Sequence, residues 1–382
     1  MNFDLSEEQK MIKLTVRDFA EREVKPLAKE LDEKAEFSVE LTKKMGELGL
    51  FGMYLPEKYG GQGLDTLSYI IAVEELARID SSQAATLAAH NSLGISPLYY
   101  YGTEEQKMKY LPQLCTGSGL WAFGLTEPNA GSDSRGTKTF ATKKGNNWLI
   151  NGSKIFITNG SSPLSIGTTV QTVSKKDNDK LEFTTFIVEN KTEGFTQVPM
   201  HGKMMWRASD TSELYFDNCE VPNENMLGKI GQGSRIMLST LDNGRLSIAA
   251  MGLGLAQGAY EMALKYSKER KQFGKPISKF QTIAFYLVSM GTKIELARNL
   301  LYKACWLKDN NRPFAKEAAM SKLYCSEIAK EVADMAVQIH GGYGLMKDYD
   351  VERFYRDQRL LQIGEGTSEI QRLVISRYLL RE

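Results

Sequence analysis

The feature that most constrains the fold is the order of three regions that differ in their pattern of apolar residues. Up to about residue 114 apolar residues recur at helical spacing. From 121 to 222 short runs rich in β-branched residues alternate with turns, and beyond Gly231 helical periodicity returns. This uncommon order predicts an α+β multidomain protein, with an N-terminal helical domain (1–120), a middle β-barrel-like domain (121–230) and a C-terminal helical bundle (231–382).

Local signals place individual elements. Ser6-Glu7-Glu8-Gln9 has the form of a capping box, which predicts that a helix begins there. Trp148–Ile150 and Lys154–Ile157 flank Asn151-Gly152, a pattern that predicts a β-hairpin with a two-residue turn. The uncharged segment Ser81–Thr103 holds histidine, asparagine and proline, so we expect a buried helix pair rather than a membrane span. We further expect a solvated loop at Ser174–Lys180, strands at 183–188 and 212–216, and long helices at 234–265, 281–309 and 314–337.

The composition excludes several classes of protein. The 48 basic and 47 acidic residues nearly cancel, so no nucleic-acid partner is expected. Four widely spaced cysteines without a CxxC pair, and only three histidines, argue against a metal site and against a disulfide framework. The first residues lack the pattern of a signal peptide, and we expect a cytoplasmic protein of bacterial type, or a mitochondrial-matrix protein only if a transit peptide has been removed.

Common nucleotide and hydrolase motifs are missing from the sequence. Gly117–Ala122 matches the dinucleotide-binding glycine pattern only loosely, because no βαβ unit surrounds it. Neither GxxxxGK[ST] nor GxSxG occurs. The sequence therefore gives no support for a nicotinamide fold, a nucleotide triphosphatase or a serine hydrolase.

The strongest candidate for chemistry is Glu365, which stands between two glycines within Leu361–Arg372. The glycines let the backbone turn and let a flat ligand approach closely. A carboxylate between an apolar run and a helix is suited to act as a general base, and the alternative is a glutamate at a surface turn.

Other runs combine small residues with hydroxyl, aromatic or basic groups. Gly124–Asp133 offers Thr126 and Ser132, and its alternative interpretation is an ordinary turn. Phe156–Gly160 offers an aromatic ring and a hydroxyl two residues apart on the same side of a strand, although an aromatic there is usually in the core. Three further runs also have ordinary structural interpretations, as a helix-face ion pair at Asp242–Arg245, a solvated helix end at Arg270–Lys275 and a C-cap at Gln338–Gly344.

Taken together and in this order, six runs resemble the acyl-CoA dehydrogenase family over essentially the whole chain. They are GLTEPNAGSD (124–133), FITNG (156–160), LDNGR (241–245), ERKQFGKP (269–276), QIHGGYG (338–344) and GEGTSEIQR (364–372). The resemblance implies the three-domain fold given above with a four-helix bundle at the C-terminus, bound FAD, and assembly as a homotetramer.

The resemblance also implies roles for particular residues. Residues expected to line the flavin and its pyrophosphate are Phe123, Leu125, Thr126 and Ser132. Phe156 is expected to lie against the isoalloxazine ring, where many relatives carry tryptophan, and Thr158 to hydrogen-bond near the reactive ring nitrogen. The groups expected to hold the FAD of a partner subunit are Arg270, Phe273, Gln281, Gln338, Gly341 and Gly342, and those expected to touch FAD after the catalytic turn are Thr367 and Glu369. Contacts to the CoA substrate are expected from Ser132, Asp242, Arg245 and Gly366.

The implied reaction is α,β-dehydrogenation of an acyl-CoA. Glu365 would remove the C2 proton while the flavin accepts hydride from C3, and the Glu365 N–H would hydrogen-bond the thioester oxygen. Burial beside an acyl chain is expected to raise the pKa of this carboxyl. Some relatives carry the base at the position of Gly244, which cannot serve here. Electrons are expected to pass to electron-transferring flavoprotein.

The sequence leaves the acyl group open. Short, branched or alicyclic groups all fit the resemblance, whereas a dicarboxylic substrate is disfavoured because Ala84–Ala89 lacks the arginine that glutaryl-CoA relatives carry in the matching stretch. His90 and Asn91 lie either near the acyl tail or in helix packing. Two alternatives to a dehydrogenase are a flavin oxidase or monooxygenase on the same scaffold and a non-catalytic FAD-binding protein.

Overall fold

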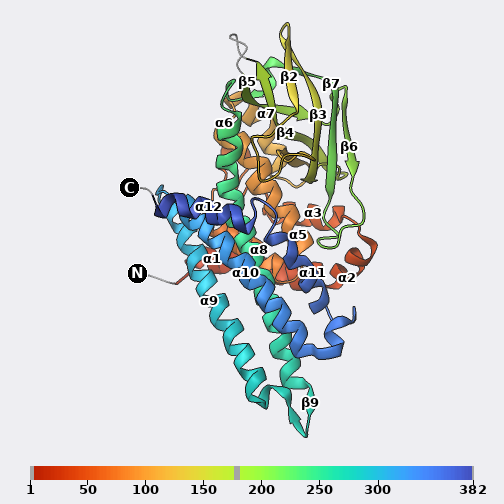
Figure 1. The fold of residues 1–382 in the computed structure, drawn as a ribbon, viewed down its shortest axis with the longest axis vertical. Helices are drawn as coiled ribbons and strands as arrows, with labels where there is room; N and C mark the ends of the chain where they lie inside the picture. The colour runs from red at the N-terminus through yellow and green to blue at the C-terminus, as the bar shows by residue number, and fades with distance from the viewer. Residues whose placement is uncertain (1–3, 176–180, 381–382) are drawn as a thin grey trace.

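The computed structural model describes residues 4–175 and 181–380, so most of the loop predicted at Ser174–Lys180 lies outside the described residues. Figure 1 shows a β-sheet at one end of the molecule and long helices that extend to the opposite end. The predicted order of helical, β and helical parts is confirmed. No helix among the described residues is both long enough and apolar enough to cross a membrane.

The first part is helical. Its elements are α1 (Glu7–Phe19), η1 (Ala20–Val24), α2 (Lys25–Lys34), α3 (Val39–Glu47), η2 (Glu57–Tyr59), α4 (Thr66–Ala77), α5 (Ser81–Ala89), η3 (His90–Ile95), α6 (Ser96–Tyr101) and α7 (Glu104–Leu114). The predicted capping box is present, because Ser6 Oγ accepts a hydrogen bond from Gln9 N and the Gln9 side chain accepts one from Ser6 N.

The buried helices predicted over Ser81–Thr103 are present as α5 and α6, although no loop separates them. Residues 81–101 form one continuous helical segment, in which the wider π-helical turn η3 joins α5 to α6. Asn91 in this turn donates to Leu50 O at 2.9 Å and accepts from Gly52 N at 2.7 Å, and His90 Nε2 lies 2.8 Å from Leu114 O. These contacts assign both side chains to helix packing, the second of the two roles considered for them.

The middle part is one sheet of eight strands. The strands are β1 (Leu120–Gly124), β2 (Phe140–Lys144), β3 (Asn147–Thr158), β4 (Ser165–Lys175), β5 (Leu181–Glu189), β6 (Phe195–Pro199), β7 (Thr211–Pro222) and β8 (Met226–Leu227), with η4 (Asn223–Asn225) before β8. Their spatial order is β6-β7-β3-β2-β4-β5-β8, and β1 pairs in parallel with β4. Trp148, Ile150, Phe186 and Leu214 are among the fully buried residues of its core.

The hairpin predicted at Asn151-Gly152 is wrong. β3 runs unbroken from Asn147 to Thr158 between β2 and β7, and its register against β7 shifts between Ile150 and Gly152. Gly152 has a φ of 142°, and a Cβ atom there would lie 2.7 Å from the Thr139 Cα atom. The dipeptide therefore marks an irregularity where the backbone approaches a neighbouring segment closely, and not a chain reversal.

The last part is a helical bundle. It comprises α8 (Gly233–Glu269), β9 (Lys271–Gln272), β10 (Lys275–Pro276), η5 (Ile277–Lys279), α9 (Gln281–Asp309), α10 (Ala315–His340), η6 (Gly341–Leu345), α11 (Val351–Leu361) and α12 (Ser368–Leu379). α8 packs closely against two other helices through glycines. A Cβ atom built on Gly252 would lie 2.8 Å from Cys325 O of α10, and one built on Gly254 would collide with Glu74 O of α4. A side chain at either position would force the helices apart.

Candidate active site

The turn that carries Glu365 joins α11 to α12 and is fixed by side chains of α10. Ser326 Oγ donates to Leu361 O at 2.8 Å, where the turn begins. Glu327 accepts from Gln362 Nε2 at 2.9 Å and from Ser368 Oγ at 2.7 Å, so its two oxygens hold the two sides of the turn. The turn is therefore a rigid connection.

Two donors converge on one carbonyl within this turn. Gly366 O accepts from Lys322 Nζ at 2.7 Å and from Gln371 Nε2 at 2.9 Å. Glu365 has a φ of 53° and Gly366 a φ of 93°, both in the left-handed region. That conformation is strained for a glutamate, and a strained residue held this firmly is typical of functional sites.

The carboxylate of Glu365 lies directly against the backbone of α8. A Cβ atom built on Gly244 would collide with Glu365 Oε2, and it would lie 3.0 Å from the Leu93 Cδ2 atom of η3. Oε2 is buried and has no hydrogen-bond partner among the described residues. Burial raises the pKa of Glu365 to about 7, against the opposing charges of Lys322 and Arg245. The alternative of a solvated surface turn is wrong, because the carboxylate points inward.

The predicted ion pair on α8 flanks this carboxylate. Arg245 Nη1 contacts Asp242 Oδ1, and the Arg245 side chain is only 8% exposed. Arg245 Nε is buried without a partner among the described residues. Burial raises the pKa of Asp242, although Arg245 counteracts it. A buried pair with a spare donor differs from the solvated helix-face pair that the spacing alone suggested, and it leaves polar atoms available to a ligand.

Phe156 lies on the surface at a second irregularity in β3. The register against β7 shifts between Lys154 and Ile157, Phe156 has a φ of 61°, and its side chain is 63% exposed. The usual core position of a strand aromatic is therefore wrong for this residue. Because Lys154 is fully buried, the irregularity breaks the expected alternation of faces and turns an aromatic ring outward.

A buried ion pair attaches the small-residue loop to this strand. Lys154 Nζ donates to Glu127 Oε1 at 2.7 Å and to Leu125 O at 3.1 Å, and Ile155 N donates to Thr126 O at 3.0 Å. Burial lowers the pKa of Lys154 to about 8, although Glu127 opposes the shift. The structure thereby brings Leu125 and Thr126 beside the segment that carries Phe156. Of the other predicted flavin-lining residues, Phe123 is buried in β1, Thr158 is half-buried and Ser132 is exposed.

The remaining predicted cofactor residues lie elsewhere. The β9–β10 hairpin lies at the end of the bundle farthest from the sheet (Figure 1). Phe273 at its tip is 92% exposed with a φ of 52°. A surface cavity of about 540 Å³ beside the hairpin is lined by residues that include Arg270, Gly341, Gly342 and Tyr343. Gln281 and Gln338, near helix ends in this region, are exposed. One chain thus presents two separate surfaces, and the structure does not bring the two predicted sets together.

Thr367 and Glu369 flank the start of α12. Thr367 is the N-cap of this helix, and its Oγ1 accepts from Ile370 N at 3.2 Å. Glu369 is exposed in the first turn.

Sequence reasoning missed two residues of this region. Lys322 lies on a largely apolar helix face, with Ala318, Ala319 and Cys325 buried around it and Ser326 one turn further on. The second is Tyr69 of α4, whose hydroxyl oxygen lies 2.8 Å from Ser247 Oγ and 3.2 Å from Ala88 O. A lysine in an apolar helical stripe was a signal in the sequence, because lysine is rarely buried without a partner.

Comparison with known proteins gives a consistent result over the whole chain. Sequence profiles match for the acyl-CoA dehydrogenase N-terminal domain at residues 6–118, the middle domain at 122–219 and the C-terminal domain at 231–380. A probable acyl-CoA dehydrogenase of Bacillus subtilis is 51% identical, with 100% of both chains covered. A short-chain-specific acyl-CoA dehydrogenase of Clostridium acetobutylicum is 47% identical, again with 100% of both covered.

Solved structures agree. Butyryl-CoA dehydrogenase of Megasphaera elsdenii is 45% identical with a TM-score of 0.96, and 100% of both chains is covered. A chain from a study of the electron transferring flavoprotein of Acidaminococcus fermentans is 47% identical with a TM-score of 0.97, at the same full coverage. An acyl-CoA dehydrogenase of Bacillus anthracis complexed with FAD is 36% identical with a TM-score of 0.92, covering 99% of this chain and 68% of that one.

Proposed function

This chain belongs to the acyl-CoA dehydrogenase family, and from that premise we propose that it oxidises a short acyl-CoA to the 2-enoyl-CoA with Glu365 as the base. One observation carries the assignment. The Glu365 Oε2 atom is buried, lacks a hydrogen-bond partner among the described residues and lies against Gly244, where no side chain competes for the space. A carboxylate without a partner is available to accept a proton.

The residues present fit FAD as the cofactor, which a relative of known structure binds. Phe156 offers an exposed aromatic ring beside the Leu125–Thr126 backbone, and the second surface offers Arg270 and Phe273 beside a cavity. When bound, FAD supplies the acceptor for the hydride from C3. The protein supplies position and a dry environment.

Glu365 is suited to remove a weakly acidic proton near neutral pH. Its pKa of about 7 lies close to the working pH, so a large fraction is ionised while it remains basic enough to accept the C2 proton. Its own backbone N–H is the group that would stabilise negative charge on the thioester oxygen. Asp242 and Arg245 lie on either side of Gly244 in α8. We propose that they orient the CoA portion, with the Arg245 Nε atom, which has no partner among the described residues, as one available donor.

The separation of the two surfaces supports assembly into a homo-oligomer. Arg270 and Phe273 lie at the far end of the bundle from the sheet, so they are placed to reach the FAD of another subunit rather than their own (Figure 1). We propose the homotetramer as the active form, and electron-transferring flavoprotein as the electron acceptor, in keeping with the study that yielded one similar structure.

Tyr69 supports a short acyl group. It is 3% exposed, and its hydroxyl is hydrogen-bonded to Ser247, one turn of α8 beyond Gly244. The pKa of Tyr69 is raised by burial and also by the charge of Glu365, which indicates that the two groups are close. A bulky phenol close to the base is expected to limit the length of the acyl tail. Dicarboxylic tails remain disfavoured, because the stretch 84–89 on α5 brings no cation.

The test is anaerobic titration of the FAD-bound protein with butyryl-, isobutyryl-, cyclohexanoyl- and octanoyl-CoA while flavin absorbance is followed. We expect butyryl-CoA to bleach the flavin fully and octanoyl-CoA to do so weakly. Absence of bleaching by every thioester would favour the non-catalytic alternative. Fast turnover with oxygen that survives Glu365→Gln would favour the oxidase or monooxygenase.

A further inference from the structure

Lys322 of α10 is a fully buried lysine without a carboxylate partner. No Asp or Glu oxygen among the described residues lies within ion-pair distance of its Nζ atom, and the side chain is 0% exposed. Its hydrogen-bond acceptor is Gly366 O, at 2.7 Å. Burial of an ammonium group is strongly unfavourable without compensation, so a buried cation at this place calls for a functional reason.

The charge of Lys322 faces the proposed base. Several groups around Lys322 carry charge, namely Glu365 and Glu369 at the turn, Arg245 on α8 and Glu327 on α10. Burial lowers the pKa of Lys322 to about 8, and Glu365 is the first of the charges that oppose this shift. In the reverse direction Lys322, ahead of Arg245, opposes the rise in the pKa of Glu365. Tyr69 faces the base from α4 as a neutral group.

A neutral side chain makes the same hydrogen bond. Gln371 Nε2 also donates to Gly366 O, at 2.9 Å, and it approaches Glu365 O at 3.4 Å. An amide therefore suffices to hold this carbonyl. Lys322 differs from Gln371 in that it also brings a positive charge. Substituting the two donors one at a time therefore distinguishes the effect of the charge from the effect of the hydrogen bond.

We propose that Lys322 is a positioning residue of the dehydrogenation, which anchors the Gly366 carbonyl next to the proton acceptor Glu365 and places a positive charge close to this turn. The inference rests on the proposed function. The charge favours the ionised carboxylate in a pocket whose desolvation favours the neutral form, so the base is kept both buried and available.

The experiment compares Lys322→Gln with Gln371→Met, both as FAD-bound enzyme. Lys322→Gln keeps a hydrogen-bond donor and removes the charge, whereas Gln371→Met removes a donor and keeps the charge. For each variant the pH profile of kcat/KM with butyryl-CoA is measured with an artificial electron acceptor. We expect the acid limb in Lys322→Gln to move up by about one pH unit, which corresponds to roughly 1.4 kcal/mol of differential stabilisation. In Gln371→Met the rate falls and the limb stays in place.

An unshifted limb in Lys322→Gln, or an equal shift in Gln371→Met, overturns the proposal. Lys322→Arg serves as the rescue variant, because it keeps the charge and is expected to keep the wild-type limb. Should Lys322→Gln lose FAD, recovery of FAD in Lys322→Arg supports the role of charge and failure to recover it overturns that role. Failure of the wild-type enzyme to reduce its flavin with any acyl-CoA would instead contradict the proposed function, so the two failures are distinguishable.

Discussion

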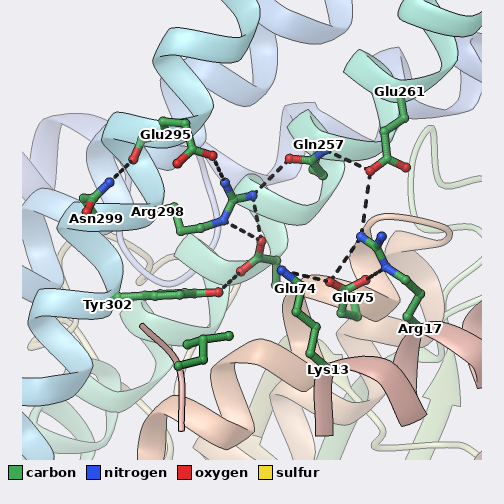
Figure 2. Close-up of a pocket in the computed structure, with 11 residues that line it drawn as sticks. Lys13, Arg17, Glu74, Glu75, Gln257, Glu261, Glu295, Arg298, Asn299 and Tyr302 are labelled. Atoms are coloured by element: carbon green, nitrogen blue, oxygen red, sulfur yellow. Dashed lines mark hydrogen bonds and ion pairs between the residues drawn. The ribbon is translucent and has the colours of Figure 1, made fainter. Parts of the chain in front are cut away.

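Two groups of buried carboxylates in this protein have opposite surroundings. Glu74 and Glu75 of α4 lie beside a cavity of about 560 Å³, where Figure 2 shows them among the arginine and lysine side chains of neighbouring helices. Glu365 lies in the turn between α11 and α12, and its Oε2 atom has no hydrogen-bond partner in the described part of the chain. Glu74 and Glu75 are buried, and at Glu365 the Oε2 atom is buried although the residue as a whole is half-buried, so the clearest difference lies in the partners.

Every oxygen of the first pair has a partner. Glu74 accepts from Arg298 Nη2 at 3.0 Å and from the Tyr302 hydroxyl at 2.8 Å. Glu75 Oε2 accepts from Arg17 Nε at 2.9 Å and from Arg78 Nε at 3.2 Å, and Glu75 Oε1 accepts from Arg17 Nη2 at 3.4 Å. The dashed contacts of Figure 2 run between α1, α4, α8 and α9, so this network fastens the N-terminal helices to the bundle. A network satisfied in this way has little capacity left for a ligand or a proton.

The comparison teaches that burial alone does not make a carboxylate reactive. When cations and hydroxyls bind both oxygens of a buried carboxylate, as at Glu74, the carboxylate has a structural role. At Glu365 the Oε2 atom faces Gly244, which has no side chain, and the nearby cation Lys322 binds the adjacent carbonyl of Gly366 rather than the carboxylate. These surroundings make Glu365 a candidate base. Substitutions at the two places are therefore expected to affect different properties.

The largest expected effect is on chemistry. Glu365→Gln keeps the size of the side chain and removes the base, so flavin reduction by butyryl-CoA should slow by at least about 10³-fold. Stopped-flow absorbance measures the rate, and the flavin spectrum verifies that FAD is still bound. A slowing of less than tenfold would show that another group takes the proton.

The next effect is on stability at the other cluster. Glu74→Ala removes the buried carboxylate partner of Arg298, leaves the exposed Glu295 as its remaining ion-pair partner and takes the acceptor from the Tyr302 hydroxyl, and we expect a loss of about 3 kcal/mol in the free energy of unfolding. Urea unfolding measures it, with the flavin-reduction rate of the folded fraction expected to stay near wild type. Glu30→Ala is the control, because its pair with Lys34 is exposed and its loss is expected to change stability little. Equal losses in the two variants would contradict the structural role of the network.

A smaller effect of opposite sign is expected at the active site. The pKa of Glu365 is raised from 4.5 to about 7 in the folded protein, so the folded state binds the proton more tightly than the unfolded chain. The stability that this proton brings is complete below the unfolded pKa and is lost as pH rises through about 7. Glu365→Gln should therefore be more stable than wild type by about 1–3 kcal/mol at pH 8 and by little at pH 5.

Thermal unfolding of the two FAD-bound proteins at both pH values checks this expectation. A gain in stability that is the same at pH 5 and pH 8 would show that the ionised carboxylate is not the cause.

The smallest expected effect is on the choice of acyl chain. It concerns Tyr69, which lies on α4, the same helix that contributes Glu74 to the ion-pair network. Tyr69→Ala should open space for a longer acyl tail and raise the ratio of kcat/KM for octanoyl-CoA over butyryl-CoA by about tenfold, as expected if one or two of the additional methylenes gain contacts worth about 1 kcal/mol each. Tyr69→Phe, which removes only the hydroxyl, should leave that ratio within about twofold. A ratio unchanged in Tyr69→Ala would place the end of the acyl tail elsewhere.

The sequence by itself determined the features that depend on neighbours along the chain. The capping box at Ser6, the span Gln281–Asp309 of a long helix and the order of helical and β parts all follow from local periodicity and capping. Glu365 could also be singled out from the sequence, because the glycines on either side of it indicate the turn in which it lies. Chain order and local preference decide such features before any tertiary contact forms.

Only the tertiary structure decided what depends on residues far apart. Asn151-Gly152 has the local preference of a turn, yet pairing of β3 with both β2 and β7 keeps the strand continuous through it. The carboxylate of Glu365 meets Gly244 from another helix, and Lys322 reaches the turn from a third. Desolvation and charge act through space, so the protonation of a buried group is set by the packing of distant segments and not by the residues beside it in the chain.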